Sequence, residues 1–226
     1  RLIDTAEMYK NEAAIQEALK RSGLPREEVF IMTKLSKQSM TDPRQAVQRS
    51  LRALGVDYID MYLLHHHPGD DFELRKVWQS LETMYREGLL KAIGVSNFGF
   101  SQLQQMLSWA EIPPMALQTL FSVFHKGESL HNAGTRQSLV AYCQVQGIVP
   151  IAFRVFDTYA GNGKVLLEDL HVRSAAQAAG LSSPAKALLH WTVRKGVVPL
   201  FSSYNAKHIA EGSQALDAPA WNAETE

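Results

Sequence analysis

The sequence predicts an α/β protein of the (β/α)8 TIM barrel class, and three observations support this prediction. Short apolar strands alternate with amphipathic helices in one direction along the chain, with a unit length of about 25 to 40 residues. Neither a residue-level repeat nor a linker interrupts the alternation. No G-x-G-x-x-G or G-x-x-x-x-G-K-S/T motif is found, whereas a doubly wound nucleotide-binding sheet would usually carry one. We therefore expect a single barrel-type domain over residues 1–226 rather than a doubly wound sheet.

The first half of the chain supplies four strands, each followed by a helix. Asp42 precedes Pro43, a pattern typical of a helix that starts with an N-cap and a proline at its first position. Gly23 and Gly55 provide stops for the two preceding helices. Ser101 is expected to cap the fourth helix. Strands are expected at 2–4, 29–34, 58–64 and 92–95, and helices at 11–22, 42–54, 72–87 and 101–107.

The second half continues the alternation with three more strands. Ser183 and Pro184 form another helix cap, and 161–163 is expected to be a flexible tip. Strands are expected at 116–119, 148–153 and 196–201, and helices at 135–146, 168–179, 185–194 and 206–215. The chain begins with Arg in what reads as a strand, and the tail after Gly212 is short. We therefore expect a barrel that lacks its first strand and part of its carboxyl-terminal tail.

The composition fits a soluble globular protein with a generous core. Of 226 residues, 46% are hydrophobic, and 23 Lys and Arg balance 23 Asp and Glu. This balance excludes a strong attraction to nucleic acid or to anionic membranes, and the apolar runs are too short to span a bilayer. The single cysteine, Cys143, lies in an apolar stretch and is expected to be a buried thiol rather than a nucleophile. With no signal peptide visible, we expect a cytoplasmic protein; the sequence predicts no oligomeric state.

Polar side chains mark the carboxyl ends of the expected strands, where a barrel gathers its chemistry. Each of them alone could simply satisfy a local hydrogen bond, but together they favour a site that reduces a carbonyl group. The residues at these positions are Asp4, Lys34, His65, Ser96, Asn97, Gln118, Phe153, Ser202 and Ser203.

Carbonyl reduction needs a hydride on carbon and a proton on the developing alkoxide. Tyr9 follows Asp4 at the entrance of the next helix, but a phenol with a pKa of about 10 matches neutral pH poorly. The ammonium group of Lys34 is expected to lower that pKa, with Asp4 as its counter-charge. His65 can donate a hydrogen bond that orients the carbonyl oxygen.

Four stretches resemble the aldo-keto reductase family in order and spacing. They are Arg1-Leu-Ile-Asp-Thr-Ala-x-x-Tyr-x-Asn-Glu12, Phe30-Ile-x-Thr-Lys34, Ile59-Asp-x-Tyr-Leu-Leu-His65 and Gly94-Val-Ser-Asn-Phe98, and the resemblance extends to about residue 212. It implies a TIM barrel, Tyr9 as proton donor, Lys34 and Asp4 as the groups that tune it, and His65 as the group that orients a small carbonyl substrate.

The same resemblance implies residues that bind NADP(H). Ser96, Asn97 and Gln118 would hold the nicotinamide carboxamide, and Phe153 would stack on its ring in place of the more common tyrosine. Arg154 stands where the family has a small residue, and a pyrophosphate contact and a surface salt bridge both stay open for it.

The stretch after the last strand departs from the family pattern. Ser202 and His208 replace the lysine and arginine that clamp the 2′-phosphate, although Lys207 is adjacent and Ser203 is retained. Neutral histidine does not bind phosphate as the planar arginine fork does, so NAD(H) also stays open as the cofactor.

The run His65-His66-His67 raises the alternative of a metal site. Neighbouring residues on a strand point to opposite faces, so only His65 and His67 could share a metal ion. No cysteine or carboxylate-rich partner stands at a supporting spacing, so we expect no metal. His66 replaces an aromatic residue that is common in the family, which should make the substrate pocket more polar.

Three functions therefore stay open. The first is an NAD(P)H-dependent reductase of aldehydes or ketones, which the joint presence of Asp4, Tyr9, Lys34 and His65 favours. The second is a cofactor-binding regulatory or redox-sensing protein on the same scaffold. The third is a truncated isoform of low activity, because a barrel without its first strand would expose unpaired strand edges.

Overall fold

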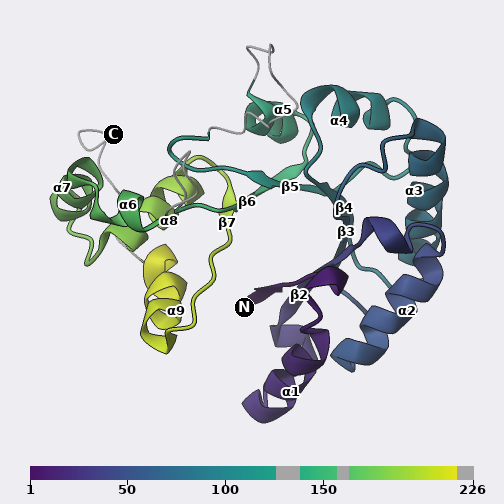
Figure 1. The fold of residues 1–226 in the computed structure, drawn as a ribbon, viewed down its shortest axis with the longest axis horizontal. Helices are drawn as coiled ribbons and strands as arrows, with labels where there is room; N and C mark the ends of the chain where they lie inside the picture. The colour runs from purple at the N-terminus through teal and green to yellow at the C-terminus, as the bar shows by residue number, and fades with distance from the viewer. Residues whose placement is uncertain (126–137, 157–162, 218–226) are drawn as a thin grey trace. The chain divides into compact units, whose positions relative to one another are not determined.

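The computed structural model describes residues 1–125, 138–156 and 163–217. Its contacts divide the chain into two compact units, Arg1–Leu117 and Gln118–Glu226. Within both units, strands and helices follow one another in the alternating order that the sequence predicts (Figure 1). Among the described residues, no helix is both long enough and apolar enough to cross a membrane.

The first unit is built on parallel strands whose order follows the sequence. Leu2 pairs with Phe30, Thr33 with Tyr62, and Leu63 with Gly94, so each strand lies beside the next one in the chain. Because these strands are parallel, their carboxyl ends meet at one edge of the sheet. The strands are β1 (Leu2–Asp4), β2 (Phe30–Leu35), β3 (Met61–Leu64) and β4 (Ile93–Ser96), and the sequence of this unit continues into β5 (Ala116–Leu120).

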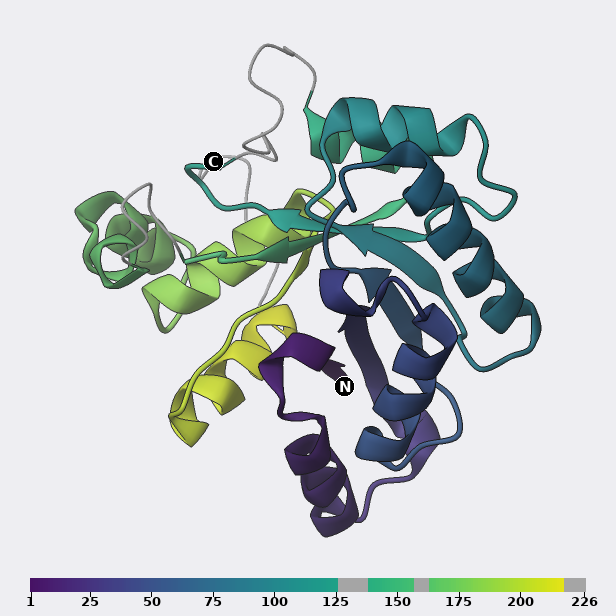
Figure 2. The same ribbon diagram turned by 45° about the vertical axis from the view of Figure 1, so that its right-hand side comes forward.

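Helices and short 3-10 turns connect these strands. Helices α2 and α3 run along one side of the sheet, as Figures 1 and 2 show. The helices are α1 (Glu12–Ser22), α2 (Pro43–Leu54), α3 (Asp71–Arg86) and α4 (Phe100–Leu107), and the 3-10 turns are η1 (Glu7–Tyr9), η2 (Arg26–Glu28) and η3 (Lys37–Ser39).

The core of the first unit lies between the strands and the apolar stripes of α2 and α3. The inner face of α3 buries Leu74, Val77, Trp78, Leu81 and Met84. Gly94 marks a close approach between strands. A Cβ atom there would lie 2.6 Å from the carbonyl oxygen of Ala116 and 2.7 Å from the side chain of Leu63, so only glycine fits without a shift of the backbone.

The second unit contains the parallel pair β6–β7, with Ile151 opposite Val198. Its core gathers around Phe121, whose ring stacks on Trp191 at a centroid distance of 5.3 Å. The elements are α5 (Leu139–Val145), β6 (Val149–Phe153), α6 (Gly163–Glu168), α7 (Leu170–Ala178), α8 (Pro184–Arg194), β7 (Val198–Pro199), α9 (Ala206–Ser213) and η4 (Gln214–Asp217).

Several expected boundaries are wrong. The third strand starts at Met61 instead of residue 58, and the last strand covers Val198–Pro199 only. Gly99 instead of Ser101 caps α4, because the side chain of Gln102 accepts a hydrogen bond from the Gly99 backbone N–H.

Two other findings concern exposure and flexibility. The first strand is only partly buried, with Leu2 42% exposed. Gly163 begins helix α6 instead of lying in a flexible tip; residues 157–162 and 135–137 lie outside the described part of the chain.

Candidate active site

Lys34 is the most buried charged side chain of the candidate site. It stands near the end of β2 with no exposed surface, and its Nζ donates to three oxygens. These are Oδ1 and Oδ2 of Asp4, at 2.7 and 2.8 Å, and the backbone carbonyl of Thr5, at 2.7 Å. Burial lowers the pKa of Lys34, and the neighbouring Asp4 carboxylate opposes part of that change. The expected counter-charge is therefore in contact with the lysine.

Tyr9 ends the 3-10 turn η1, five residues after Asp4. Its ring is 49% exposed, and the Lys34 ammonium lies 5.2 Å from the ring centroid. Burial and the charge of Asp4 raise the pKa of Tyr9, which corrects the expectation that Lys34 would lower it. The physical reasons are burial, which disfavours the charged phenolate, and the negative charge of Asp4, which offsets the positive charge of Lys34 at the phenol. The Tyr9 hydroxyl therefore stays protonated at neutral pH.

His65 follows β3 and completes this group. Its ring lies 5.8 Å from the Tyr9 ring, edge to face at 83°, and His66 stacks on its other side at 4.7 Å. Burial, helped by the positive charge of Lys34 and by His66, lowers the pKa of His65 to about 4. The imidazole is thus neutral at physiological pH, and its Nδ1 atom has no hydrogen-bond partner among the described residues.

The structure therefore brings together all four predicted catalytic residues within the first unit. Asp4 and Lys34 come from the paired strands β1 and β2, His65 follows β3, and Tyr9 lies on the turn after β1. A protonated phenol and a neutral imidazole are in edge-to-face contact, and the phenol ring lies near the Lys34–Asp4 ion pair. This arrangement can give a proton to one oxygen atom and donate a hydrogen bond to the same atom.

Ser96 and Asn97 extend this edge at the end of β4. Ser96 is fully buried, and Asn97 adopts the left-handed conformation, with φ 59°. The Asn97 side-chain amide donates to the backbone carbonyl of His65 at 3.0 Å and to the hydroxyl of Ser96 at 3.1 Å. The two residues predicted to hold a carboxamide thus lie next to the predicted catalytic histidine.

The remaining predicted cofactor residues belong to the second unit. Gln118 is buried on β5, Phe153 is the last residue of β6, and Arg154 follows it with φ 56°. Ser202 is exposed and follows β7 by three residues.

His208 lies in the first turn of α9, which Asn205 caps by accepting from the backbone N–H of Lys207 at 2.9 Å. The ring nitrogens of His208 lie 3.4 Å from the Ser203 hydroxyl and 3.4 Å from the Asn205 amide. Polar groups at a helix N-terminus of this kind can meet a phosphate, and Lys207 and His208 are both exposed here.

Glu7 is a site residue that the sequence reasoning missed. It occupies a variable position of the motif, between Ala6 and Tyr9, for which the sequence predicts no role. Its carboxylate accepts hydrogen bonds from Ser36, Ser39 and Arg49. The available signal was an acidic residue two positions before Tyr9. This signal alone does not predict the hydrogen bonds of Glu7, because its partners are distant in the sequence.

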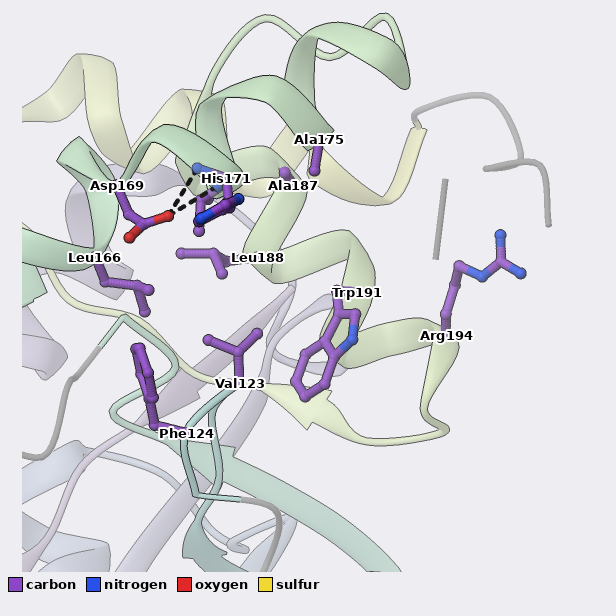
Figure 3. Close-up of a pocket in the computed structure, with 11 residues that line it drawn as sticks. Val123, Phe124, Leu166, Asp169, His171, Ala175, Ala187, Leu188, Trp191 and Arg194 are labelled. Atoms are coloured by element: carbon purple, nitrogen blue, oxygen red, sulfur yellow. Dashed lines mark hydrogen bonds between the residues drawn. The ribbon is translucent and has the colours of Figure 1, made fainter. Parts of the chain in front are cut away.

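The second unit also contains a cavity of about 500 Å³, shown in Figure 3. Apolar side chains such as Val123, Leu188 and Trp191 line it, and it contains none of the predicted site residues. Its carboxylate, Asp169, already accepts from the backbone N–H groups of His171 and Val172 at the start of α7. The cavity is therefore lined mainly by apolar side chains, and its carboxylate is already hydrogen-bonded to the backbone. Within the described residues, no group of three His, Cys, Asp or Glu side chains could hold a metal ion.

Comparison with known proteins identifies the family that this chain resembles. The model of the aldo/keto reductase family matches residues 1–224. The glyoxal reductase of Bacillus subtilis (strain 168) is 35% identical over 219 residues, which cover 96% of this chain and 73% of that protein. The methylglyoxal reductase DkgA of Yersinia pestis is 30% identical over 217 residues, covering 96% of this chain and 74% of that one.

A solved structure shows the same fold. An aldo-keto reductase from a Medee basin deep-sea metagenome library matches with a TM-score of 0.88 at 31% identity, over 100% of this chain and 78% of that chain. This similarity confirms the (β/α)8 fold class. The predictions of a single domain over residues 1–226 and of an absent first strand stay predictions.

Proposed function

We propose that this chain, which belongs to the aldo/keto reductase family, reduces aldehydes or ketones to alcohols with a nicotinamide cofactor. One observation carries the proposal, namely the contact of Lys34 with Asp4 near a protonated Tyr9, whose ring contacts a neutral His65. A protein that only binds the cofactor has no need of all four groups.

The chemistry of each residue follows from its protonation state. NAD(P)H, when bound, supplies a hydride to the carbonyl carbon. His65 is neutral and can donate a hydrogen bond to the carbonyl oxygen, which fixes its position. The Tyr9 hydroxyl is protonated and gives its proton to that oxygen as negative charge develops. The phenolate that remains lies near the ammonium of Lys34 and recovers a proton from solvent, because the ring is half exposed.

The residues present fit a nicotinamide cofactor in chemical type. Ser96 and Asn97 supply a hydroxyl and an amide beside His65, which suits a carboxamide with one donor and one acceptor end. Gln118 supplies a second amide, and Phe153 offers the π face that stacking requires. Arg154 is proposed to reach the pyrophosphate group.

Cofactor preference is proposed to be weak. Ser202, Ser203 and His208 would surround a 2′-phosphate without a lysine or an arginine among them, and Lys207 is the adjacent lysine in the sequence. A 2′-phosphate gains most from charge-assisted bonds, so we expect NADPH to be accepted with little advantage over NADH. The single cysteine is a buried free thiol, which agrees with the proposed cytoplasmic location.

Small polar aldehydes are the proposed substrates. Two relatives are named for the reduction of glyoxal and methylglyoxal, which are short dicarbonyl compounds. His66 is exposed and stacks on His65, so a polar ring borders the position proposed for the carbonyl oxygen.

The deciding experiment is turnover by the wild-type chain and by Tyr9→Phe. After its intact mass is confirmed, the protein is assayed with NADPH or NADH and with glyoxal, methylglyoxal or a small aromatic aldehyde. We expect wild-type turnover and a loss of about 10²-fold or more in kcat for Tyr9→Phe. Equal turnover by both proteins would refute the role of Tyr9. Cofactor binding without turnover in the wild type would instead favour a regulatory or low-activity protein.

A further inference from the structure

Glu7 is tied to its surroundings through both carboxylate oxygens. Its Oε2 atom accepts from the backbone N–H and the hydroxyl of Ser36, at 3.3 and 2.9 Å. Its Oε1 atom accepts from the hydroxyl of Ser39 at 2.8 Å and from Arg49 Nη2 at 2.9 Å. Four bonds to one carboxylate hold that side chain in a single geometry.

The carboxylate is sheltered and charged. The side chain of Glu7 is 19% exposed, and Arg49 pairs with it from α2. Burial alone would raise the pKa of Glu7, but the hydrogen bonds from Arg49, Ser39 and Ser36 outweigh it and keep the pKa below its usual value. Arg49 is itself held by the side-chain oxygen of Gln45 at 2.7 Å. The Arg49 side chain is 41% exposed, but its hydrogen bonds to Glu7, Ser39 and Gln45 restrict where its guanidinium group can lie.

This network connects the two stretches that carry the proposed proton donor and its lysine. Tyr9 comes two residues after Glu7, and Lys34 comes two residues before Ser36. The bonds from Ser36 to Glu7 therefore fasten the turn that carries Tyr9 to the end of the strand that carries Lys34.

The turn between Glu7 and Tyr9 is short and closed. The backbone N–H of Tyr9 donates to Ala6 at 2.9 Å, and that of Lys10 donates to Glu7 at 3.2 Å. Since the Tyr9 ring is half exposed, packing alone constrains it weakly, and the backbone of this turn decides where the hydroxyl lies. A shift of the Glu7 backbone would therefore also move Tyr9, because both residues belong to the same 3-10 turn.

We propose that Glu7 is a positioning residue for Tyr9, anchored by Ser36, Ser39 and Arg49 at the distance from Lys34 and His65 that proton donation needs. The inference rests on the proposed role of Tyr9 as proton donor. Glu7 does not touch the carbonyl substrate in this view; it acts through the turn that it holds.

The test compares Glu7→Gln with a matched control, Glu87→Gln. Glutamine keeps the size of Glu7 but loses the charge and one acceptor atom facing Ser36 and Arg49. Glu87 forms an exposed ion pair with Arg44 on the same helix as Arg49, away from Tyr9 in the sequence and in its hydrogen bonds. We expect Glu7→Gln to lower kcat about tenfold or more with the KM for NADPH unchanged, and Glu87→Gln to behave as wild type.

A second comparison separates positioning from general damage to the fold. If Glu7 acts through Tyr9, Glu7→Gln should lower kcat in the wild type but have no further effect on the residual turnover of Tyr9→Phe. An equal loss in both backgrounds, or full activity of Glu7→Gln with Tyr9→Phe inactive, would overturn the proposal and leave the role of Tyr9 standing. Full activity of Tyr9→Phe would refute both.

A milder variant protects the test against misfolding. Ser39→Ala removes the hydrogen bond from the Ser39 hydroxyl to Glu7 Oε1, together with the bonds that this hydroxyl accepts from Ser36 and Arg49, and leaves the charge of Glu7 in place. Should Glu7→Gln fail to show a cooperative thermal transition, Ser39→Ala should give the same pattern at about two- to fivefold lower kcat, because the other bonds to Glu7 remain. Wild-type kcat for a folded Ser39→Ala would then count against the proposal.

Discussion

Two polar regions of this molecule are held in very different ways. At the end of β2, Lys34 is fully buried and makes three bonds of 2.7 to 2.8 Å, two of them to the carboxylate of Asp4. At the start of α9, His208 is exposed and lies 3.4 Å from each of two neutral side chains. Short charge-assisted bonds fix a geometry, whereas long neutral contacts leave it adjustable.

The contrast indicates different functional demands. Proton transfer depends on positions held to within about 1 Å, so the groups proposed for it are buried and cross-linked. The groups proposed to meet a 2′-phosphate need only complementary charge, and here the charge itself is sparse. The three predictions below change one region or the other.

The largest expected effect comes from Lys34→Met. This change removes the ammonium from a contact with a carboxylate that is only 19% exposed, and it should lower the free energy of unfolding by about 3–5 kcal/mol. Urea denaturation at pH 7 measures the change. Arg44→Met is the control, because it removes a cation from an exposed bidentate pair with Glu87 and should leave the midpoint of unfolding unchanged. Similar midpoints for the two variants would contradict the comparison.

An intermediate effect is expected when the second region is given cations. The double variant Ser202→Lys/His208→Arg restores the lysine and arginine of the family pattern beside α9. We expect its dissociation constant for NADPH to fall about tenfold, with that for NADH unchanged, because only NADPH carries the 2′-phosphate. Fluorescence titration with each cofactor is the measurement. An equal change in the two dissociation constants would show that the new cations do not act on the 2′-phosphate.

The third prediction concerns the pH response of His65. Its pKa in the folded protein is about 4, below the ordinary value of 6.5 that the unfolded chain should show. Between these values the unfolded state binds more protons, so the stability contributed by neutral His65 is complete above about pH 6.5 and is lost as the pH falls towards 4. Proton NMR should give a titration midpoint near pH 4, assigned by comparison with His65→Gln. A midpoint above 6 would contradict the environment described for this ring.

The sequence predicted most of the fold because its local signals agree with one another. Asp42 with Pro43, Gly55 and the apolar stripe of α3 all mark features that the structure contains. The last strand was overestimated, since an apolar run from 196 to 201 cannot reveal that the strand paired with β6 covers Val198–Pro199 only.

The candidate site was predicted in its members but not in its electrostatics. Strand-end positions and motifs pointed to Asp4, Lys34 and His65, and the structure brings them together with Tyr9. The pKa of Tyr9 was expected to fall and instead rises, because that outcome depends on which charge contacts Lys34 and on burial. Glu7 was missed for a similar reason, since its partner Arg49 is 42 residues away in the chain.

The three bonds of Lys34 have one further consequence. An ammonium group has three N–H donors, and here each already has an acceptor, two on Asp4 and one on Thr5. Lys34 therefore has no donor left for the Tyr9 oxygen while these bonds persist. It stabilises a phenolate through space, by the field of its charge, unless one of the bonds is exchanged during turnover. Lys34 then acts as a fixed positive charge, and the Asp4 carboxylate in contact with it determines how strongly that charge stabilises the phenolate.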